Sequence, residues 1–246
     1  MGNGYGQYCP LALAAEIFSE RWTLLVLSRL LDGCTRFNEI HRGVPRISAS
    51  LLSQRLKALE QAAIVERRPL PGSRACEYLL TPAGRELEPV LESLAVWGQR
   101  WARDMALDDL DVRFLAWSMH TRVDPRAMPA GRTVVELRFS GGPDGGCVFW
   151  LVNETDRVEM CLQDPGFEVD LVVSAELVRF VETWRGFRPL ADEIARGRIR
   201  LAGPAALKQA FPRWLLLSSL ARVERQRQGR ELATCRRSRH GARATR

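Results

Sequence analysis

The chain has 246 residues, of which 46% are hydrophobic and 26% are charged, as in ordinary globular proteins of one or two domains. This composition excludes a collagen-like or wholly disordered chain. The formal net charge of +7 is unevenly distributed: residues 1–104 carry 13 basic and 11 acidic side chains, residues 105–221 carry 14 and 16, and residues 222–246 carry 9 and 2. Because the excess lies in the last 25 residues, the overall charge by itself does not indicate a nucleic-acid-binding protein.

The sequence contains no recognisable membrane helix, secretory signal, zinc-site spacing or disulfide framework. No apolar run approaches the ~20 residues of a membrane helix, and no basic residue precedes Arg21 as in a secretory signal. Six cysteines and three histidines lack the spacing of a zinc site or a disulfide framework. We expect a cytoplasmic protein with no membrane association, no metal and no cofactor. All but two of the 36 basic residues are arginine, a skew that we interpret as GC-rich codon usage and hence a bacterial source.

Apolar residues at helical spacing predict four helices in the first part of the chain. The expected segments are 11–18, a second helix from Arg21 to Asp32–Gly33, a short third helix from Phe37 to His41 that ends at Gly43, and a fourth that Ser48 opens as N-cap. Leu52, Leu56, Leu59 and Ala63 share one face of the fourth helix. Segments 64–70 and 76–81 then predict a hairpin, and Pro82 begins a long helix that extends through Trp101.

This order of elements is that of a winged helix-turn-helix. The face of the fourth helix opposite the leucines carries short polar groups followed by longer ones, which suit base edges and flanking phosphates in a major groove. Arginines on the hairpin can reach phosphates or the minor groove. The predicted DNA-binding residues are Arg46, Ser48, Ser50, Ser53, Gln54, Lys57, Arg67 and Arg74. A solvated helix face and an ordinary basic hairpin explain the same polarity equally well.

Motifs over residues 5–103 resemble those of the HxlR-type transcriptional regulators, which are relatives of the MarR regulators. The matching segments are Tyr8-Cys9-Pro10, Arg21-Trp22-Thr23-Leu24-Leu25, Arg36-Phe37-Asn38-Glu39-Ile40, Leu52-Ser53-Gln54-Arg55-Leu56 and Tyr78-Leu79-Leu80-Thr81-Pro82. The resemblance implies a winged-helix homodimer that binds a double-stranded DNA operator, with segments 10–18 and 82–103 at the dimer interface. The same apolar residues would also serve the core of a monomer.

Cys9 precedes Pro10 at the start of the first helix. Some members of the resembled family use this cysteine as an electrophile or disulfide sensor, often with partner cysteines near the end of the domain. Residues 77–146 contain no cysteine, so a sensor here would depend on Cys9 of two subunits or on thiol modification. A lone cysteine is otherwise a small buried apolar residue.

The second half of the chain predicts an α+β domain, with strands before helices. Expected strands are 134–139, 147–152, 157–162, 168–173 and 198–201, and expected helices are 109–118, 175–183, 190–195 and a segment from Ala205 onward. The segments Asp164-Pro165-Gly166, Val169 to Val173 and Trp184 to Gly203 resemble the sterol carrier protein type 2-like fold. That resemblance implies an apolar tunnel for a hydrophobic small-molecule effector. The candidate lining residues are Phe149, Leu151, Met160, Val172, Phe180 and Trp184, which would equally serve as ordinary core.

The fold class expected is α+β, with a winged helix-turn-helix domain at 1–104, a sterol-carrier-like domain at 105–221 and a basic, disordered tail at 222–246. No catalytic motif is present, so we do not expect an enzyme. The expected function is that of a ligand-responsive DNA-binding regulator. Two alternatives are a thiol-based redox regulator acting through Cys9 and a carrier of small hydrophobic ligands.

Overall fold

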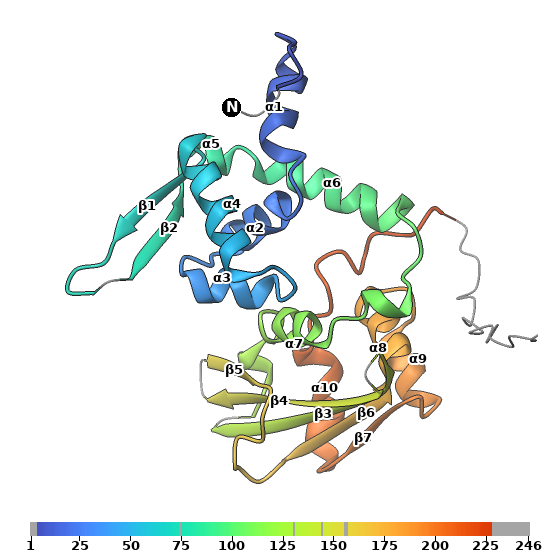
Figure 1. Ribbon diagram of the computed structural model, residues 1–246. Coiled ribbons are helices and arrows are strands. Elements are labelled where there is room, and N and C mark those ends of the chain that lie inside the picture. Colours follow the sequence, from blue (N-terminus) through green and yellow to red (C-terminus); the bar gives the residue numbers. More distant parts are fainter. Residues whose placement is uncertain (1–3, 74, 130, 144, 155–156, 228–246) are drawn as a thin grey trace, which may run out of the picture.

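The computed structural model describes residues 4–73, 75–129, 131–143, 145–154 and 157–227 (Figure 1). Its elements form an N-terminal group of helices with a two-stranded hairpin and a C-terminal group around a five-stranded sheet. Arg74 of the predicted DNA-binding set and residues 228–246 of the tail lie outside the described residues. Within the ranges that are described, no helix is long and apolar enough to cross a membrane.

The N-terminal elements follow the order of a winged helix. They are α1 (Pro10–Phe18), α2 (Thr23–Leu31), α3 (Phe37–Gly43), α4 (Ala49–Gln61), β1 (Val65–Pro69), β2 (Cys76–Leu80), α5 (Pro82–Arg85) and α6 (Glu88–Trp101). Strands β1 and β2 pair antiparallel and project from the helices as the wing (Figure 1). This arrangement confirms the predicted winged helix-turn-helix fold.

Helix α4 begins and packs largely as its sequence predicts. The Ser48 hydroxyl accepts a hydrogen bond from the Leu51 backbone N–H at 3.3 Å, and so it caps the helix. Leu52, Leu56 and Leu59 are at most 1% exposed and pack in the domain core. The prediction that Ala63 shares their face is wrong, because α4 ends at Gln61 and Ala63 turns the chain toward β1 with a φ of +56°.

The predicted long helix from Pro82 is divided into α5 and α6. The Thr81 hydroxyl accepts a hydrogen bond from the Gly84 N–H at 3.2 Å and caps α5, which ends at Arg85. Pro89, in the first turn of α6, has no amide hydrogen to donate to the Arg85 carbonyl oxygen. A proline is tolerated in a first helical turn but not in the interior of a helix, so the prediction of one continuous helix is wrong.

The C-terminal elements form an α+β unit with one mixed sheet. They are η1 (Leu107–Asp109), α7 (Val112–His120), η2 (Pro125–Ala127), β3 (Arg132–Gly142), β4 (Gly145–Glu154), β5 (Arg157–Cys161), β6 (Leu171–Glu176), α8 (Leu177–Trp184), α9 (Leu190–Ala195), β7 (Ile199–Ala202) and α10 (Ala205–Trp214). The strand order is β5-β4-β3-β6-β7, with β3 and β6 parallel and the other neighbours antiparallel. The predicted helix from Ala175 starts two residues later, because Ala175 still pairs with Phe139 in the sheet.

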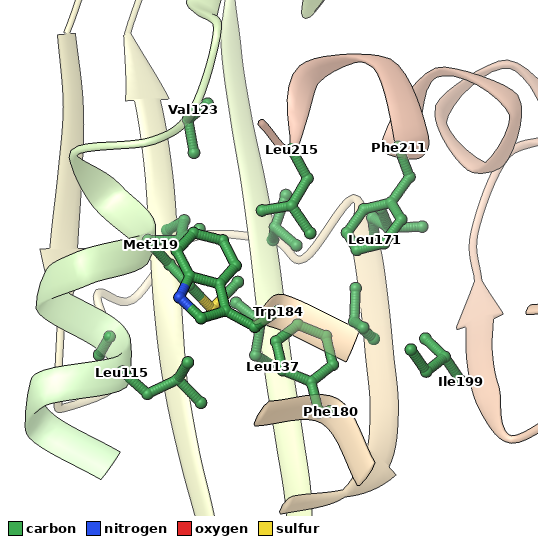
Figure 2. Close-up of a cluster of buried hydrophobic side chains, with 14 of the residues drawn as sticks. Leu115, Met119, Val123, Leu137, Leu171, Phe180, Trp184, Ile199, Phe211 and Leu215 are labelled. Atoms are coloured by element: carbon green, nitrogen blue, oxygen red, sulfur yellow. The ribbon is translucent and has the colours of Figure 1, made fainter. Parts of the chain in front are cut away.

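Alternation along the strands gives this sheet a buried face and a second, more polar face. Leu137 of β3 and Leu171 of β6 point into the buried core, where α7 contributes Leu115 and Met119 (Figure 2). Phe180 and Trp184 of α8, Phe211 of α10 and Leu215 just after α10 complete it. The helices thereby fill the space over this face of the sheet.

The six residues predicted to line an apolar pocket do not all lie on the same side of the sheet. Phe149, Leu151 and Phe180 are at most 1% exposed, Trp184 is buried, and Met160 packs against the same core. The rings of Phe139 and Phe180 lie 4.7 Å apart, centroid to centroid. Val172 falls on the opposite face, because its strand neighbours Leu171 and Val173 point into the core. The prediction of a shared pocket is therefore wrong for Val172, and the other five belong to the packed core.

Candidate nucleic-acid interface

The exposed face of α4 presents the polar residues that the sequence singles out. Ser50, Ser53, Gln54 and Lys57 are all exposed, at the spacing of one helical face, on the side away from the buried leucines. The helix lies beside the wing in the order expected for a reading helix and its flanking hairpin (Figure 1). The structure therefore brings these four side chains together on one accessible surface.

The turn that precedes α4 is fixed by hydrogen bonds. His41 Nε2 lies 2.9 Å from the carbonyl oxygen of Ile47, which closes the segment between α3 and α4. Arg55, on the side of α4, donates to the Glu20 carboxylate at 2.8 Å and to the Arg21 carbonyl oxygen at 3.1 Å. These contacts hold α4 against the rest of the domain, so its exposed face has a defined orientation before any ligand binds.

The wing presents basic side chains on a strand that is anchored to the helical core. Arg67 is exposed on β1, and the Arg68 guanidinium lies 3.3 Å from the Glu66 carboxylate. In the middle of β2 the Tyr78 N–H donates to the Thr35 carbonyl oxygen at 2.8 Å. The wing therefore extends from the domain with Arg67 available to an anionic partner.

Arg46 lies in the turn before α4, but it is engaged by the C-terminal domain. Its Nε atom donates to the Asp111 carboxylate at 3.1 Å, and the Arg46 side chain remains 55% exposed. Asp111 also caps α7, since its other oxygen accepts from the backbone N–H groups of Arg113 and Phe114. Arg46, which the sequence predicts to contact DNA, is thus held by an acidic residue of the other domain.

A second contact between the domains centres on Arg29 of α2. The Arg29 guanidinium stacks over the Trp117 ring at 4.3 Å from its centroid and lies 5.8 Å from that of Phe114. Asp32 pairs with the same guanidinium at 3.0 Å, and burial lowers the pKa of Arg29. Gly43, at the end of α3, permits this approach, because a β-carbon there would lie 2.4 Å from the Arg29 side chain. The α2–α3 region is therefore packed directly on α7.

A third contact joins α6 to α8 and to the segment that follows α10. The Gln99 side chain is 4% exposed; its amide donates to the Arg185 carbonyl oxygen at 2.9 Å and its oxygen accepts from the Arg185 guanidinium at 2.8 Å. Arg225 donates to the Ala102 carbonyl oxygen at 2.8 Å and pairs with Asp104 at 2.5 Å. The expectation that the basic segment is disordered from residue 222 is therefore wrong for Arg225, which is ordered by these hydrogen bonds.

Helices α1 and α6 expose large apolar side chains. Leu11 is 77% exposed on α1, and Trp97 is 58% exposed on α6; Val90, Leu94 and Trp101 on α6 are also exposed. Isolated exposed apolar residues are normal, but several on the same helix indicate a surface that another protein surface covers.

Cys9 occupies the N-cap position of α1 and is exposed. The backbone N–H groups of Ala12 and Leu11, in the first turn of α1, lower the pKa of its thiol. By contrast, burial raises the pKa of Cys34 to about 11 and also raises those of Cys147 and Cys161. Cys9 therefore has more thiolate character than these three thiols at neutral pH.

Comparison with known proteins places the N-terminal domain in a family. The sequence model of the HxlR-like helix-turn-helix family matches residues 17–106. The HTH-type transcriptional regulator YvaP of Bacillus subtilis is 38% identical over 104 residues, which cover 42% of this chain and 96% of YvaP. The chain belongs to the HxlR family of helix-turn-helix transcriptional regulators.

A second relative agrees with this assignment. The regulator YodB of the same organism is 38% identical over 103 residues, covering 41% of this chain and 89% of YodB. The solved structure of reduced YodB aligns with 38% of this chain and 93% of its own, with a TM-score of 0.34. The HxlR match ends at residue 106, so this family assignment concerns the DNA-binding domain and leaves the α+β domain as an addition to it.

Sequence reasoning identified the exposed face of α4 but missed the contacts between the domains. Asp111, Trp117 and Arg185 were not among the candidate residues, although each contacts the N-terminal domain. Asp111 carried one usable signal, since an aspartate just before an apolar helical segment predicts an N-cap. Its second role, as the partner of Arg46, has no counterpart in the local sequence.

Proposed function

We propose that this HxlR-family protein is a cytosolic regulator that binds a double-stranded DNA operator as a homodimer and adjusts that binding through its C-terminal domain. The observation that carries the proposal is the row of exposed polar side chains on α4, a helix with a capped start and a fixed orientation beside a basic wing. The C-terminal domain contacts both the turn before α4 and helix α6. It is therefore positioned to influence the DNA-reading face of α4 and the exposed apolar face of α6.

The polar row divides by chemistry into base-reading and phosphate-binding groups. Gln54 can form two hydrogen bonds with one adenine edge, and Ser50 and Ser53 can bond to any of several bases. Lys57, Arg46 and Arg67 supply positive charge for the DNA backbone, and the sequence assigns the same role to Arg74. In this assignment, Ser48 acts chiefly as the N-cap that aims the helix.

The exposed apolar faces of α1 and α6 support a homodimer. Two-fold symmetry would place the same patch of each subunit opposite its copy, and two α4 helices would then enter successive major grooves. The operator expected is a pseudo-palindrome whose half-sites lie about one helical turn apart, or ~10 base pairs.

The proposal is tested by measuring the base preference of two matched variants by fluorescence anisotropy. Gln54→Ala should lose about 1–3 kcal/mol of discrimination at one base pair of each half-site. Gln61→Ala is the control, because Gln61 is exposed at the last residue of the same helix, away from its N-terminal reading end. Equal effects of the two substitutions on base preference would refute the assigned reading face.

A thiol switch at Cys9 is the second candidate function, favoured by the exposure of this thiol and by its lowered pKa. Such a switch predicts that diamide releases the protein from its operator and that Cys9→Ser does not respond, while binding in reducing buffer is unchanged. Release of both proteins to the same extent would remove Cys9 from the mechanism.

A sterol-carrier-like second domain with a hydrophobic effector stays a prediction from sequence resemblance. Thermal-shift measurements with fatty acids and sterols test it, and they also test the alternative of a ligand carrier. Removing residues 105–246 separates the carrier from the regulator, because a regulator keeps operator binding in its N-terminal domain whereas a carrier loses its activity.

A further inference from the structure

A cleft in the C-terminal domain is lined by four arginines. The cleft has a volume of about 500 Å³ and lies where β3, β6 and β7 meet the start of α8 and the turn after α9. Arg138, Arg179, Arg198 and Arg200 line it, with Ser140, Ser174 and one acidic residue, Glu176. A pocket of this size accommodates a small metabolite.

The strand register places donors of the cleft in one row. Arg138 pairs with Ser174, and Ser174 pairs with Arg200, so a serine hydroxyl lies between two arginines on three adjacent strands. Neighbouring strands are ~4.8 Å apart, so the two arginine backbones are separated by roughly 10 Å. That spacing places the Arg200 guanidinium within reach of an anionic group above Ser174, with Arg138 bordering the site on the other side.

The charges within the cleft are only partly neutralised. Arg138 pairs with Glu136, and Arg179 pairs at 3.1 Å with Glu193, whose side chain is 5% exposed. Among the ion pairs of the described residues, none involves Arg198 or Arg200. Glu136 and Glu193 hold Arg138 and Arg179 in place. The exposed Arg198 and Arg200 supply positive charge that no carboxylate neutralises among the described residues.

We propose that this cleft binds a small molecule carrying a phosphate or carboxylate group, and that it is the effector site of the regulator. Arginine presents several N–H donors in a planar arrangement that matches these anions, and charge-assisted hydrogen bonds are the strong ones. Arg198 and Arg200 would bind the anion directly, Ser174 would donate a hydroxyl hydrogen bond, and Glu176 would accept from a neighbouring hydroxyl or amine of the ligand.

Helix α8 connects this cleft to the DNA-binding domain. Arg179 lines the cleft from the first half of α8, and Arg185, just after the last residue of that helix, holds Gln99 of α6 by the reciprocal hydrogen bonds described above. A ligand bound in the cleft beside Arg179 would act on the same short helix whose end contacts α6. This part of the inference rests on the proposed DNA-binding function.

Isothermal titration calorimetry of the full-length protein tests the site, with pyrophosphate and citrate as separate probes at physiological salt. Pyrophosphate binding alone would assign a phosphate ligand, and citrate binding alone a carboxylate ligand. Arg200→Ala should weaken binding by about 10- to 100-fold, the loss expected for a charge-assisted hydrogen bond. Arg157→Ala is the matched control, because Arg157 is an exposed arginine on β5, at the opposite edge of the same sheet.

The outcomes separate this inference from the proposed function. Failure of both probes to bind at millimolar concentration, or equal weakening by Arg200→Ala and Arg157→Ala, would overturn the site while leaving operator binding intact. Weaker DNA binding by Arg200→Ala with no binding of either probe would mean that the cleft contacts nucleic acid, and would also overturn it. In an operator titration, the bound probe should change DNA affinity about 5- to 150-fold. An unchanged affinity would refute the effector role.

Discussion

Replacing Asp111 with asparagine should increase the affinity of the protein for DNA. Arg46 lies in the turn before α4, where a phosphate of the operator would approach, yet its Nε atom donates to Asp111 at 3.1 Å. A carboxylate that holds this guanidinium competes with the phosphate for it. Asparagine keeps an oxygen for the N–H groups of Arg113 and Phe114 and is a favourable N-cap, so α7 should retain its start.

The size of the effect follows from the exposure of the pair. The Arg46 side chain is 55% exposed and that of Asp111 is 18% exposed, so the ion pair is closer to a surface pair than to a buried one. Surface pairs contribute about 0.2–1 kcal/mol. Freeing Arg46 should therefore increase DNA affinity by at most about fivefold, since 1.4 kcal/mol corresponds to a factor of ten.

Fluorescence anisotropy at several salt concentrations measures both affinity and the number of phosphate contacts. The slope of log affinity against log salt should steepen by about 0.9 in Asp111→Asn if Arg46 gains one phosphate. Asp124→Asn is the matched control, because Asp124 caps η2 in the same domain by accepting from the Arg126 N–H. Weaker DNA binding in Asp111→Asn would mean that the pair maintains the binding-competent arrangement, and would refute the competition argument.

Four further outcomes are expected. If Arg67 binds a phosphate as proposed, Arg67→Ala should weaken binding to all DNA sequences alike and reduce the salt slope by about one unit; a change in base preference would contradict this role. Trp97→Glu should convert the proposed dimer to a monomer in sedimentation experiments, because it would place a charge in the proposed apolar interface; a dimer of unchanged stability would locate the interface elsewhere. Alkylation followed by mass spectrometry against pH should modify Cys9 at lower pH than Cys34, whose pKa is about 11, and the reverse order would contradict the assigned thiolate. Gly203→Ala should lower the thermal midpoint, because its φ is +152° and an added β-carbon would lie 2.5 Å from the Asp170 carbonyl oxygen; an unchanged midpoint would refute that strain.

Local chemistry made much of the N-terminal domain predictable. The Ser48 cap, the leucine face of α4 and the hairpin between residues 65 and 80 all follow from patterns within a few residues. The division between α5 and α6 was also encoded locally, by Pro89, but the apolar spacing across it favoured one continuous helix.

Features that depend on distant residues were not predictable in the same way. Arg46 and Asp111 are 65 positions apart, and no periodicity relates them. The arginine cleft arises from the register of β3, β6 and β7, in which Arg138, Ser174 and Arg200 become neighbours only once β6 pairs in parallel with β3. The aromatic side chains expected around a ligand instead fill the core, because strand alternation and the covering helices place them there.

The measurement that most directly tests DNA recognition by α4 is a footprint of the full-length protein on genomic fragments that it selects. We expect fragments with a shared pseudo-palindromic motif and two protected major-groove segments about one helical turn, ~10 base pairs, apart. Gln54→Ala should change the base preferred within each segment. Selection without any shared motif, or protection that lacks the two-fold pattern, would contradict recognition of an operator by two α4 helices.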